Sequence, residues 1–365
     1  MNTTLITGAD GHIGQALAHW LLENGDDQLL LYVKAECESE RIAKDSRLGK
    51  LALDPRCRVI YGDLRKSDPF AQISRDRITH ILHCAAVTNF GVDQETARAV
   101  NIEGTKKLAD FATDCPRLQR LGFVSSLYAA GLRNGDIAEE LFENSAAFAN
   151  HYEWSKWEAE QILHQRSPLP WQIFRVATIL CEDMSGVVVQ QNVIHNTLRL
   201  LYYGLLSVIP GHADTRIYMT TTEFVVNAIG RLIYQADEHA MFNISNGGDD
   251  AMTLGAFADS IYTAFLRDAR FAKQGILKPL FCEQNTFRTL VKGMSQFGGT
   301  MSQAILSVAP FAAQLYSDKN VRTCALTQAL GGQLPPDTNL LIDTVSAHLI
   351  ATRWGLKPVQ ERRES

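Results

Sequence analysis

The first fourteen residues constrain this chain more than any other stretch. Residues 4–7 form a short run that predicts a buried strand, and residues 15–24 predict the helix that follows it. Gly8, Gly11 and Gly14 stand between these two elements. In this context the first glycine permits a tight turn, the second lets the backbone approach a pyrophosphate, and the third lets the helix pack closely on the strand. We therefore expect a dinucleotide site at the helix N-terminus, where free N–H groups attract phosphates; the alternative is an ordinary glycine-rich turn.

Length, composition and charge exclude several classes of protein. At 365 residues the chain is too long for one comfortable core, so we expect a main domain and a smaller one. The contents of hydrophobic residues (46%) and charged residues (21%) are those of ordinary globular proteins, which argues against disorder. A net charge of -5 gives no reason to expect binding to nucleic acid or to an anionic membrane.

The cysteines and the N-terminus predict a cytoplasmic protein. The seven cysteines are scattered without CxxC spacing, which indicates reduced thiols and gives no sign of a metal site. Met1 leads directly into the first predicted strand and leaves no room for a signal peptide. No apolar run is long enough to span a bilayer, so we expect no transmembrane segment.

Further apolar runs predict a parallel sheet, and the residues that follow each run would lie at one edge of it. The second run ends at Val33 and is followed by Lys34, with Arg41 a little later. Two cations at this place would suit a 2′-phosphate, so we favour NADP(H) over NAD(H). The alternative is that both cations belong to a surface loop that also carries three glutamates.

Later strand ends add residues of the same site. Asp63 and Leu64 follow the third strand, where an aspartate can accept from the adenine amino group or cap a helix. Ala85 and Ala86 follow the fourth strand and are small enough for the backbone to lie against a cofactor. Asn101 falls inside an apolar helix, which is costly unless its amide is hydrogen-bonded.

Ser126, Tyr152 and Lys156 are the predicted reacting residues. Tyr152 and Lys156 are four residues apart and share one face of a helix. A neighbouring ammonium lowers the pKa of a phenol, so we expect Tyr152 to act as an acid near neutral pH. Ser126 ends the fifth strand and could hydrogen-bond a substrate oxygen. A Tyr-x-x-x-Lys pair alone often lies on an ordinary helix surface. Here the pair is informative because it follows the glycine loop and the strand-end residues in the expected order and spacing.

Taken together, these stretches resemble the extended short-chain dehydrogenase/reductases, and within them the thioester reductase domains and fatty acyl-CoA reductases. The resemblance rests on residues 7–14, 83–90, 101–105 and 152–160; Phe90 and the Ser-Lys-Trp-Glu-Ala-Glu run indicate this branch. In that family a Lys or Arg after the second strand selects NADPH, which matches Lys34. The chain departs from the family at Asp10 and His12, which replace a usual Thr and aromatic residue.

The resemblance implies a set of site residues. The catalytic residues would be Ser126, Tyr152, Lys156 and Asn101. The cofactor-binding residues would be Thr7, Gly8, Asp10, Gly11, His12, Ile13, Gly14, Lys34, Arg41, Asp63, Leu64, Ala85, Ala86, Tyr152 and Lys156.

The implied fold is an α/β protein with a Rossmann-type doubly wound parallel sheet and a smaller, mainly helical C-terminal substrate domain. We assign residues 1–180 and 217–246 to the first domain, 181–216 and 247–356 to the second, and 357–365 to a polar tail.

The implied function is NADPH-dependent reduction of an acyl thioester, held on coenzyme A or a carrier protein, to an aldehyde or alcohol. The alternative is a reductase, dehydrogenase or epimerase of a free small molecule, such as a ketone, a hydroxysteroid-like compound or a sugar nucleotide. A cofactor sensor is a third class, against which the complete Ser126, Tyr152 and Lys156 set argues. A homodimer is left open. Residues 267–292 carry six cations against two anions, and we expect this stretch to attract an anionic carrier protein or coenzyme A; the alternative is a solvated helix face.

Overall fold

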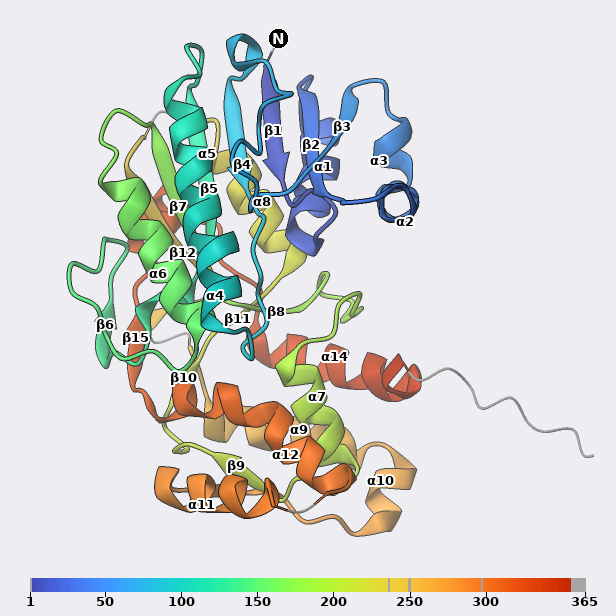
Figure 1. The fold of residues 1–365 in the computed structure, drawn as a ribbon. Coiled ribbons are helices and arrows are strands. Elements are labelled where there is room, and N and C mark those ends of the chain that lie inside the picture. The colour runs from blue at the N-terminus through green and yellow to red at the C-terminus, as the bar shows by residue number, and fades with distance from the viewer. Residues whose placement is uncertain (1, 236, 249–250, 297, 356–365) are drawn as a thin grey trace, which may run out of the picture. The chain divides into compact units, whose positions relative to one another are not determined.

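The computed structural model describes residues 2–235, 237–248, 251–296 and 298–355. The chain forms two compact units (Figure 1). The first unit comprises residues 1–178, 222–251 and 317–335, and the second comprises residues 179–221, 252–316 and 336–365.

A seven-stranded sheet, parallel throughout, forms the centre of the first unit, as the sequence predicts. Its order is β12-β7-β5-β4-β1-β2-β3. The strands are β1 (Thr3–Thr7), β2 (Gln28–Lys34), β3 (Cys57–Gly62), β4 (His80–His83), β5 (Arg120–Ser126), β7 (Trp171–Val176) and β12 (Ala240–Ile244). The strands are apolar in nearly continuous runs because helices cover both faces of the sheet.

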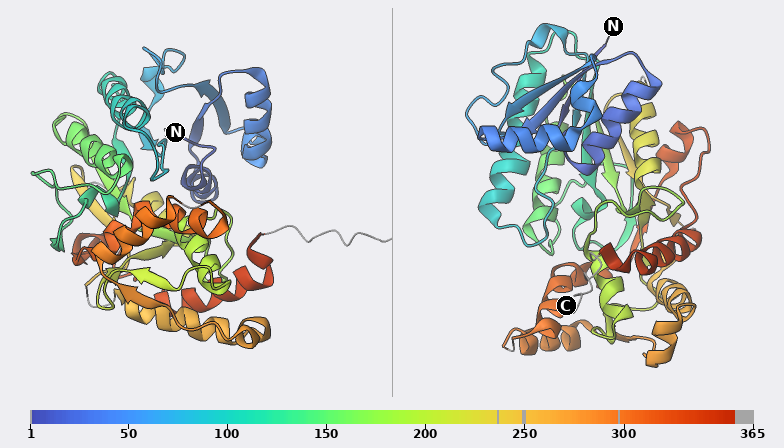
Figure 2. Two further views of the ribbon diagram at one scale, coloured as in Figure 1. Left: turned by 60° about the horizontal axis from the view of Figure 1, so that its bottom comes forward. Right: turned by 90° about the vertical axis from the view of Figure 1, so that its right-hand side faces the viewer.

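The helices form two layers around this sheet. Figures 1 and 2 show α5 and α6 on one face and α8 on the other. The helices and helical turns of the first unit are α1 (His12–Asn24), α2 (Glu38–Leu48), α3 (Lys50–Leu53), a 3-10 turn (Arg75–Arg77), α4 (Gln94–Ala97), a π-helical turn (Arg98–Ile102), α5 (Glu103–Thr113), a 3-10 turn (Leu127–Ala130), α6 (His151–His164), α8 (Thr222–Leu232) and α13 (Cys324–Ala329). This is the predicted doubly wound α/β fold.

The strand order creates a crevice beside β1. Strand β1 pairs with β2 on one side and with β4 on the other, so the chain changes direction at this strand. In open parallel sheets a ligand binds outside the carboxyl ends of the strands, at the point where the strand order reverses. The glycine loop follows β1, and Ala85 and Ala86 follow β4, at this same edge.

Residues 317–335 belong to the first unit, which corrects their predicted place in the second domain. Strand β15 (Lys319–Val321) pairs in parallel with β6 (Gly135–Ile137). The side chain of Asn243 donates to the carbonyls of Ile137 and Arg322, at 3.0 and 2.8 Å. These contacts join segments far apart in the chain, so local sequence patterns could not reveal them. Residues 217–221, predicted in the first domain, lie in the second unit, and the predicted tail at 357–365 falls outside the described residues.

The second unit is mainly helical, as the sequence predicts, and short strands connect its helices. Its helices are α7 (Val193–Tyr202), α9 (Leu254–Leu266), α10 (Ala269–Gln274), α11 (Gln284–Met294), α12 (Thr300–Ala312) and α14 (Thr338–Ala351). Its strands are β9 (Val208–Pro210), β10 (Arg216–Ile217), β11 (Met219–Thr221), β13 (Met252–Thr253) and β14 (Leu280–Cys282), and β8 (Thr178–Cys181) enters it from the first unit. Within the described ranges, no helix is both long and apolar enough to cross a membrane.

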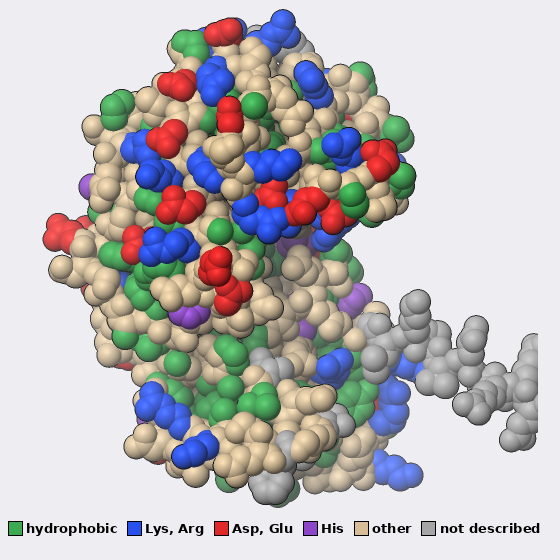
Figure 3. All heavy atoms as spheres, in the orientation of Figure 1, with side chains coloured by type: hydrophobic (Ala, Val, Ile, Leu, Met, Phe, Trp, Pro, Cys, Tyr) green, Lys and Arg blue, Asp and Glu red, His purple; other side chains and the backbone are tan. Residues whose placement is uncertain are grey.

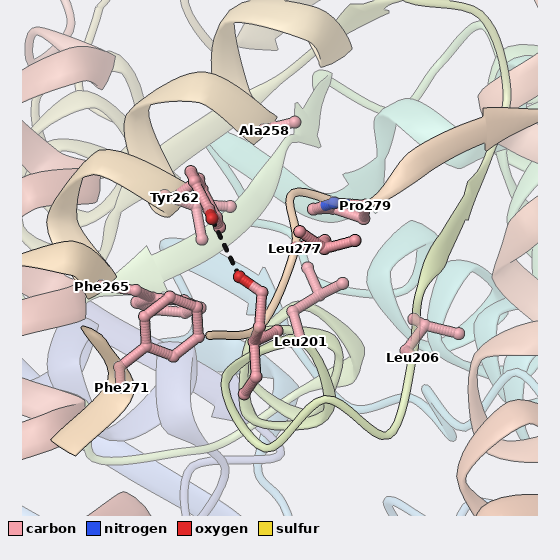
Figure 4. A pocket seen from close by; sticks show the side chains of 10 residues that line it. Leu201, Leu206, Ala258, Tyr262, Phe265, Phe271, Leu277 and Pro279 are labelled. Carbon is pink, nitrogen blue, oxygen red and sulfur yellow. Dashed lines mark hydrogen bonds between the residues drawn. The ribbon is translucent and has the colours of Figure 1, made fainter. Parts of the chain in front are cut away.

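A cavity inside the second unit is too small to hold a substrate. It measures about 10 Å³, and side chains of α7, α9 and α10 line it together with Leu206 and the segment 276–279 (Figure 4). The hydroxyl of Tyr262 donates to the carbonyl of Ile276 at 2.8 Å beside it. This volume is at most that of a single water molecule, so the aromatic core of this unit is closed here.

Candidate active site

The glycine loop has the close backbone contacts that its sequence predicts. Gly8 has a φ of 67°, and a Cβ atom there would lie 2.7 Å from the Cα of Ala85. A Cβ atom on Gly14 would lie 2.3 Å from the carbonyl oxygen of Gly8. Gly11 is the N-cap of α1 and has no side chain to occupy the free N–H groups of the first turn. The loop therefore leaves an uncovered helix N-terminus, with Ile13 in that first turn.

A cavity of about 460 Å³ lies beside this loop. Its walls come from the glycine loop, the ends of β2, β3 and β4, and the helical segment around Val100. Of the predicted cofactor residues, it brings together Gly8, Asp10, Gly11, Lys34, Asp63, Leu64, Ala85 and Ala86. The volume and the uncovered N-terminus fit the phosphates and adenosine of a dinucleotide.

Three other predicted cofactor residues make structural contacts. The Thr7 hydroxyl lies 2.6 Å from the Nδ1 of His83 and so joins β1 to β4. The Nε2 of His12 lies 2.7 Å from the hydroxyl of Thr222. Arg41 pairs with Glu38 on α2 and is absent from the described residues that line the cavity. The structure therefore does not bring Arg41 together with Lys34 at the cavity.

Arg65 is a cation of this site that sequence reasoning missed. It lines the cavity with Lys34, donates to Asp63 through Nε at 2.9 and 3.1 Å, and pairs with Glu36. These hydrogen bonds lower the pKa of Asp63 to about 2. Lys34 also pairs with Glu36, at 3.2 Å. The signal was present in the sequence, because Arg65 follows directly after Asp63 and Leu64, which the sequence predicts to lie in this site.

Lys44 is a second missed cation. Its Nζ lies 2.5 Å from the Oδ2 of Asp10, and so joins α2 to the glycine loop. Asp10 is one of the two departures from the family pattern in this loop. Only the folded chain reveals this pair, because 34 residues separate its members.

Ser126 and Tyr152 meet at the carboxyl end of β5. Their side chains are hydrogen-bonded, and the ring of Phe90 lies 5.7 Å from that of Tyr152. Burial raises the pKa of Tyr152 to about 12, and the hydrogen bond to Ser126 opposes this rise. The expectation of a lowered phenol pKa is therefore wrong for this structure, because desolvation exceeds the favourable interactions. Tyr152 is protonated at neutral pH, as a proton donor must be.

Lys156 is buried one helical turn beyond Tyr152. Its ammonium donates to the carbonyl of Val124 at 2.8 Å and lies 4.5 Å from the centre of the Phe123 ring. Burial lowers the pKa of Lys156 to about 8, and the Cys84 thiol and Glu160 oppose this shift. The side chain is therefore anchored on β5, behind the residues that face the site.

Asn101 uses its whole amide in holding other residues. It lies in the π-helical turn, a local widening of the helix that is frequent at functional sites. Its Oδ1 accepts from the N–H of Val87 at 2.8 Å, and its Nδ2 donates to the carbonyl of Val87 and the hydroxyl of Ser155. Asn101 is thus a positioning residue in this structure.

Comparison with known proteins agrees with this geometry. The profile of the male sterility protein family, an NAD-binding family, matches residues 6–229. The chain belongs to this family. It is thereby an extended short-chain dehydrogenase/reductase of the thioester reductase branch, as the sequence predicts.

Individual relatives are distant. The chain is 26% identical over 202 residues to a component of the linear gramicidin synthase of Brevibacillus parabrevis, a match that covers 50% of the chain and 4% of that protein. It is 26% identical over 272 residues to fatty acyl-CoA reductase wat of Drosophila melanogaster, which covers 61% of the chain and 52% of that protein. The terminal R domain from the myxalamid PKS-NRPS pathway has the same fold, with a TM-score of 0.78, 21% identity and coverage of 98% and 92% of the two chains. The chain thus spans only part of the curated relatives that it matches.

Proposed function

We propose that this protein is an NADPH-dependent reductase of acyl thioesters carried on a carrier protein or coenzyme A. The observation that carries the proposal is the meeting of Ser126 and Tyr152 at the end of β5, with Lys156 one turn behind, in a chain of this family. The relatives named as a fatty acyl-CoA reductase and as an R domain support the thioester as substrate.

The residues of the chain have distinct roles in this reaction. The cavity lined by Gly8, Lys34 and Asp63 would hold the reduced cofactor, which would supply a hydride to the thioester carbonyl carbon. The hydroxyls of Ser126 and Tyr152 bind the carbonyl oxygen, and Tyr152 transfers its proton to that oxygen to give a hemithioacetal. The carbon–sulfur bond then breaks, the hydroxyl proton passes to the sulfur, and an aldehyde and a thiol leave. Tyr152 recovers a proton from water.

The preference for NADPH rests on charge at the cavity. Lys34 and Arg65 both line the cavity, and they place two positive charges where we expect a 2′-phosphate to bind. Glu36 is paired with both of them. A 2′-phosphate would replace this carboxylate as their partner, because a phosphate group carries about −1.5 to −2 charges and three acceptor oxygens where a carboxylate carries one charge.

A substrate panel tests the proposal. The purified chain is incubated with NADPH or NADH and with acyl-CoAs, aldehydes, ketones and a sugar nucleotide, and cofactor absorbance and product mass are followed. We expect NADPH oxidation with acyl-CoA and release of an aldehyde or its alcohol. Turnover of ketones or sugar nucleotides alone would replace the thioester assignment with the free small-molecule alternative.

A further inference from the structure

A buried ion pair lies beneath the candidate active site. Glu160 on α6 and Arg175 on β7 both have side chains that are 0% exposed. The guanidinium donates to the carboxylate through Nε at 3.0 and 3.2 Å and through a terminal nitrogen at 2.7 Å. Arg175 also donates to the carbonyl of Ala138 at 3.1 Å and lies 3.8 Å from the centre of the Phe142 ring. Both charges are therefore removed from water and matched by each other.

The pair is connected to the residues that would react. The hydroxyl of Ser125 donates to Glu160 at 2.6 Å, and Ser125 directly precedes Ser126. Ser125 and Arg175 are register partners in the sheet. Glu160 lies one helical turn beyond Lys156, on the same helix. The carboxylate thus joins α6 to the ends of both β5 and β7.

Stability alone does not explain this arrangement. Desolvating two charges costs so much that a buried ion pair can often be replaced by apolar side chains without loss of stability. What an apolar pair could not supply is a fixed carboxylate that accepts from Ser125 and stands beside the ammonium of Lys156.

We infer that Glu160 and Arg175 are positioning residues for reduction at this site. The pair holds α6 against the end of β5, so that Tyr152 keeps its hydrogen bond to Ser126. Because the charges of Glu160 and Arg175 cancel, the pair adds no net charge beside the ammonium of Lys156. The inference rests on the proposed function only for the identity of the reaction.

The charges around Lys156 give the inference a signature that depends on pH. The titratable groups that interact with the ammonium are His83 and Cys84 from the end of β4, and Glu160 from its own helix. Strand β5 contributes an uncharged carbonyl and a phenyl ring. Glu160→Gln removes a negative charge and leaves Arg175 charged, because a guanidinium does not titrate. The ammonium of Lys156 then loses its proton at a lower pH.

The test compares wild type, Glu160→Gln, Glu160→Gln/Arg175→Met and the control Glu158→Gln, which removes a carboxylate from the same helix. For Glu160→Gln we expect kcat to fall about tenfold or more, with KM changed less than about twofold. The limb of the pH–rate profile that reports Lys156 should move to lower pH by about half a unit or more. In the double variant the limb returns toward its wild-type position, while kcat stays low because the link to Ser125 is weakened.

Two outcomes overturn the inference. One is a Glu160→Gln profile that matches that of Glu158→Gln. The other is a double variant with wild-type kcat, and this criterion also decides the matter if circular dichroism shows that the single variant does not fold. All rates are measured with the carbonyl substrate that the wild type reduces fastest. The rates of the wild type on the panel therefore identify the substrate class. The ratio of each variant's rate to that of the wild type tests the positioning role of Glu160 and Arg175. Calorimetry can also measure the pH at which NADPH binding is half lost in the wild type and in each variant. This midpoint compares the titration of Lys156 among the variants without measuring turnover.

Discussion

Asn101 is hydrogen-bonded to Ser155, with 2.9 Å between its Nδ2 and the serine Oγ. Ser155 in turn donates to the carbonyl of Tyr152 at 2.8 Å. Through Val87, the same asparagine also binds the loop that follows β4. One amide therefore fixes the helix of Tyr152 relative to the cavity wall.

This relationship predicts that Asn101→Ala is destabilising. The substitution removes a buried amide and leaves the partly buried N–H of Val87 without its acceptor, which costs about 1–3 kcal/mol of unfolding free energy. Urea denaturation measures the loss. The control is Asn89→Ala, which removes an exposed amide that accepts from Gly91 and should cost less than about 1 kcal/mol. Equal losses for the two variants would mean that Asn101 does not hold the loop.

Tyr152→Phe should abolish turnover while the cofactor still binds. The change removes the proton donor and keeps the ring, so we expect kcat to fall about 100-fold or more. Stopped-flow absorbance measures turnover, and calorimetry measures NADPH binding. Tyr203→Phe alters an exposed tyrosine of the second unit and serves as the control. If Tyr152→Phe retained the rate of that control, Tyr152 would not be the acid.

Turnover should fall as the pH rises through about 8. The pKa of Lys156 is lowered to about 8 by burial, so its positive charge is present below that pH and lost above it. Lys156→Arg keeps the charge at all accessible pH values and should remove this limb from the pH–rate profile, at a lower overall rate because the longer guanidinium cannot reproduce the bond to Val124. A limb that persists near pH 8 in this variant would have to arise from another group.

The central part of the fold and site could be predicted because its signals are local. The glycine loop, the apolar strands and the Tyr152–Lys156 spacing each lie within a dozen residues, where turn chemistry and periodicity act. The Lys44–Asp10 pair and the place of residues 317–335 could not be found in this way, because their partners are distant in the chain. Arg65 lies two residues after Asp63, so its signal was local, and only its pair with Glu36 depends on the fold. The pKa of Tyr152 was predicted in the wrong direction because a sequence shows the neighbouring cation but not the depth of burial.

The cofactor preference should depend on Arg65 more than on Arg41. Arg65→Ala and Lys34→Ala each remove a cation from the cavity, so we expect NADPH affinity to fall about tenfold and NADH affinity to change little. Arg41→Ala should have a smaller effect, because Arg41 is not among the described residues that line the cavity. Glu36→Gln should strengthen NADPH binding by removing the competing carboxylate. Calorimetry with both cofactors measures these constants, and equal affinities of the wild type for the two would reject the 2′-phosphate site.

The basic stretch at residues 267–292 is partly neutralised in the folded chain. Arg267 pairs with Asp343 at 3.1 Å, Arg270 pairs with Asp268 at 3.3 Å, and Lys278 pairs with Asp259. The remaining cations of the stretch are Lys273, Arg288 and Lys292, which are exposed and have no ion pair among the described residues. By contrast, on the face drawn in Figure 3, the Lys and Arg side chains of the first unit are interspersed with Asp and Glu.

If this stretch attracts an anionic carrier protein or coenzyme A, then Lys273, Arg288 and Lys292 should supply most of the attraction. Changing all three to Glu should raise KM for an acyl-CoA about tenfold at low salt, and the difference from wild type should shrink as added salt screens the charges. A short free aldehyde lacks the anionic handle and should be reduced at the wild-type rate. The control changes three exposed cations of the first unit to Glu, with the same shift in net charge: Lys50, Arg58 and Lys106. Equal KM changes in the two triple variants, or an equal change for the free aldehyde, would show that net charge and not docking at this stretch governs the effect.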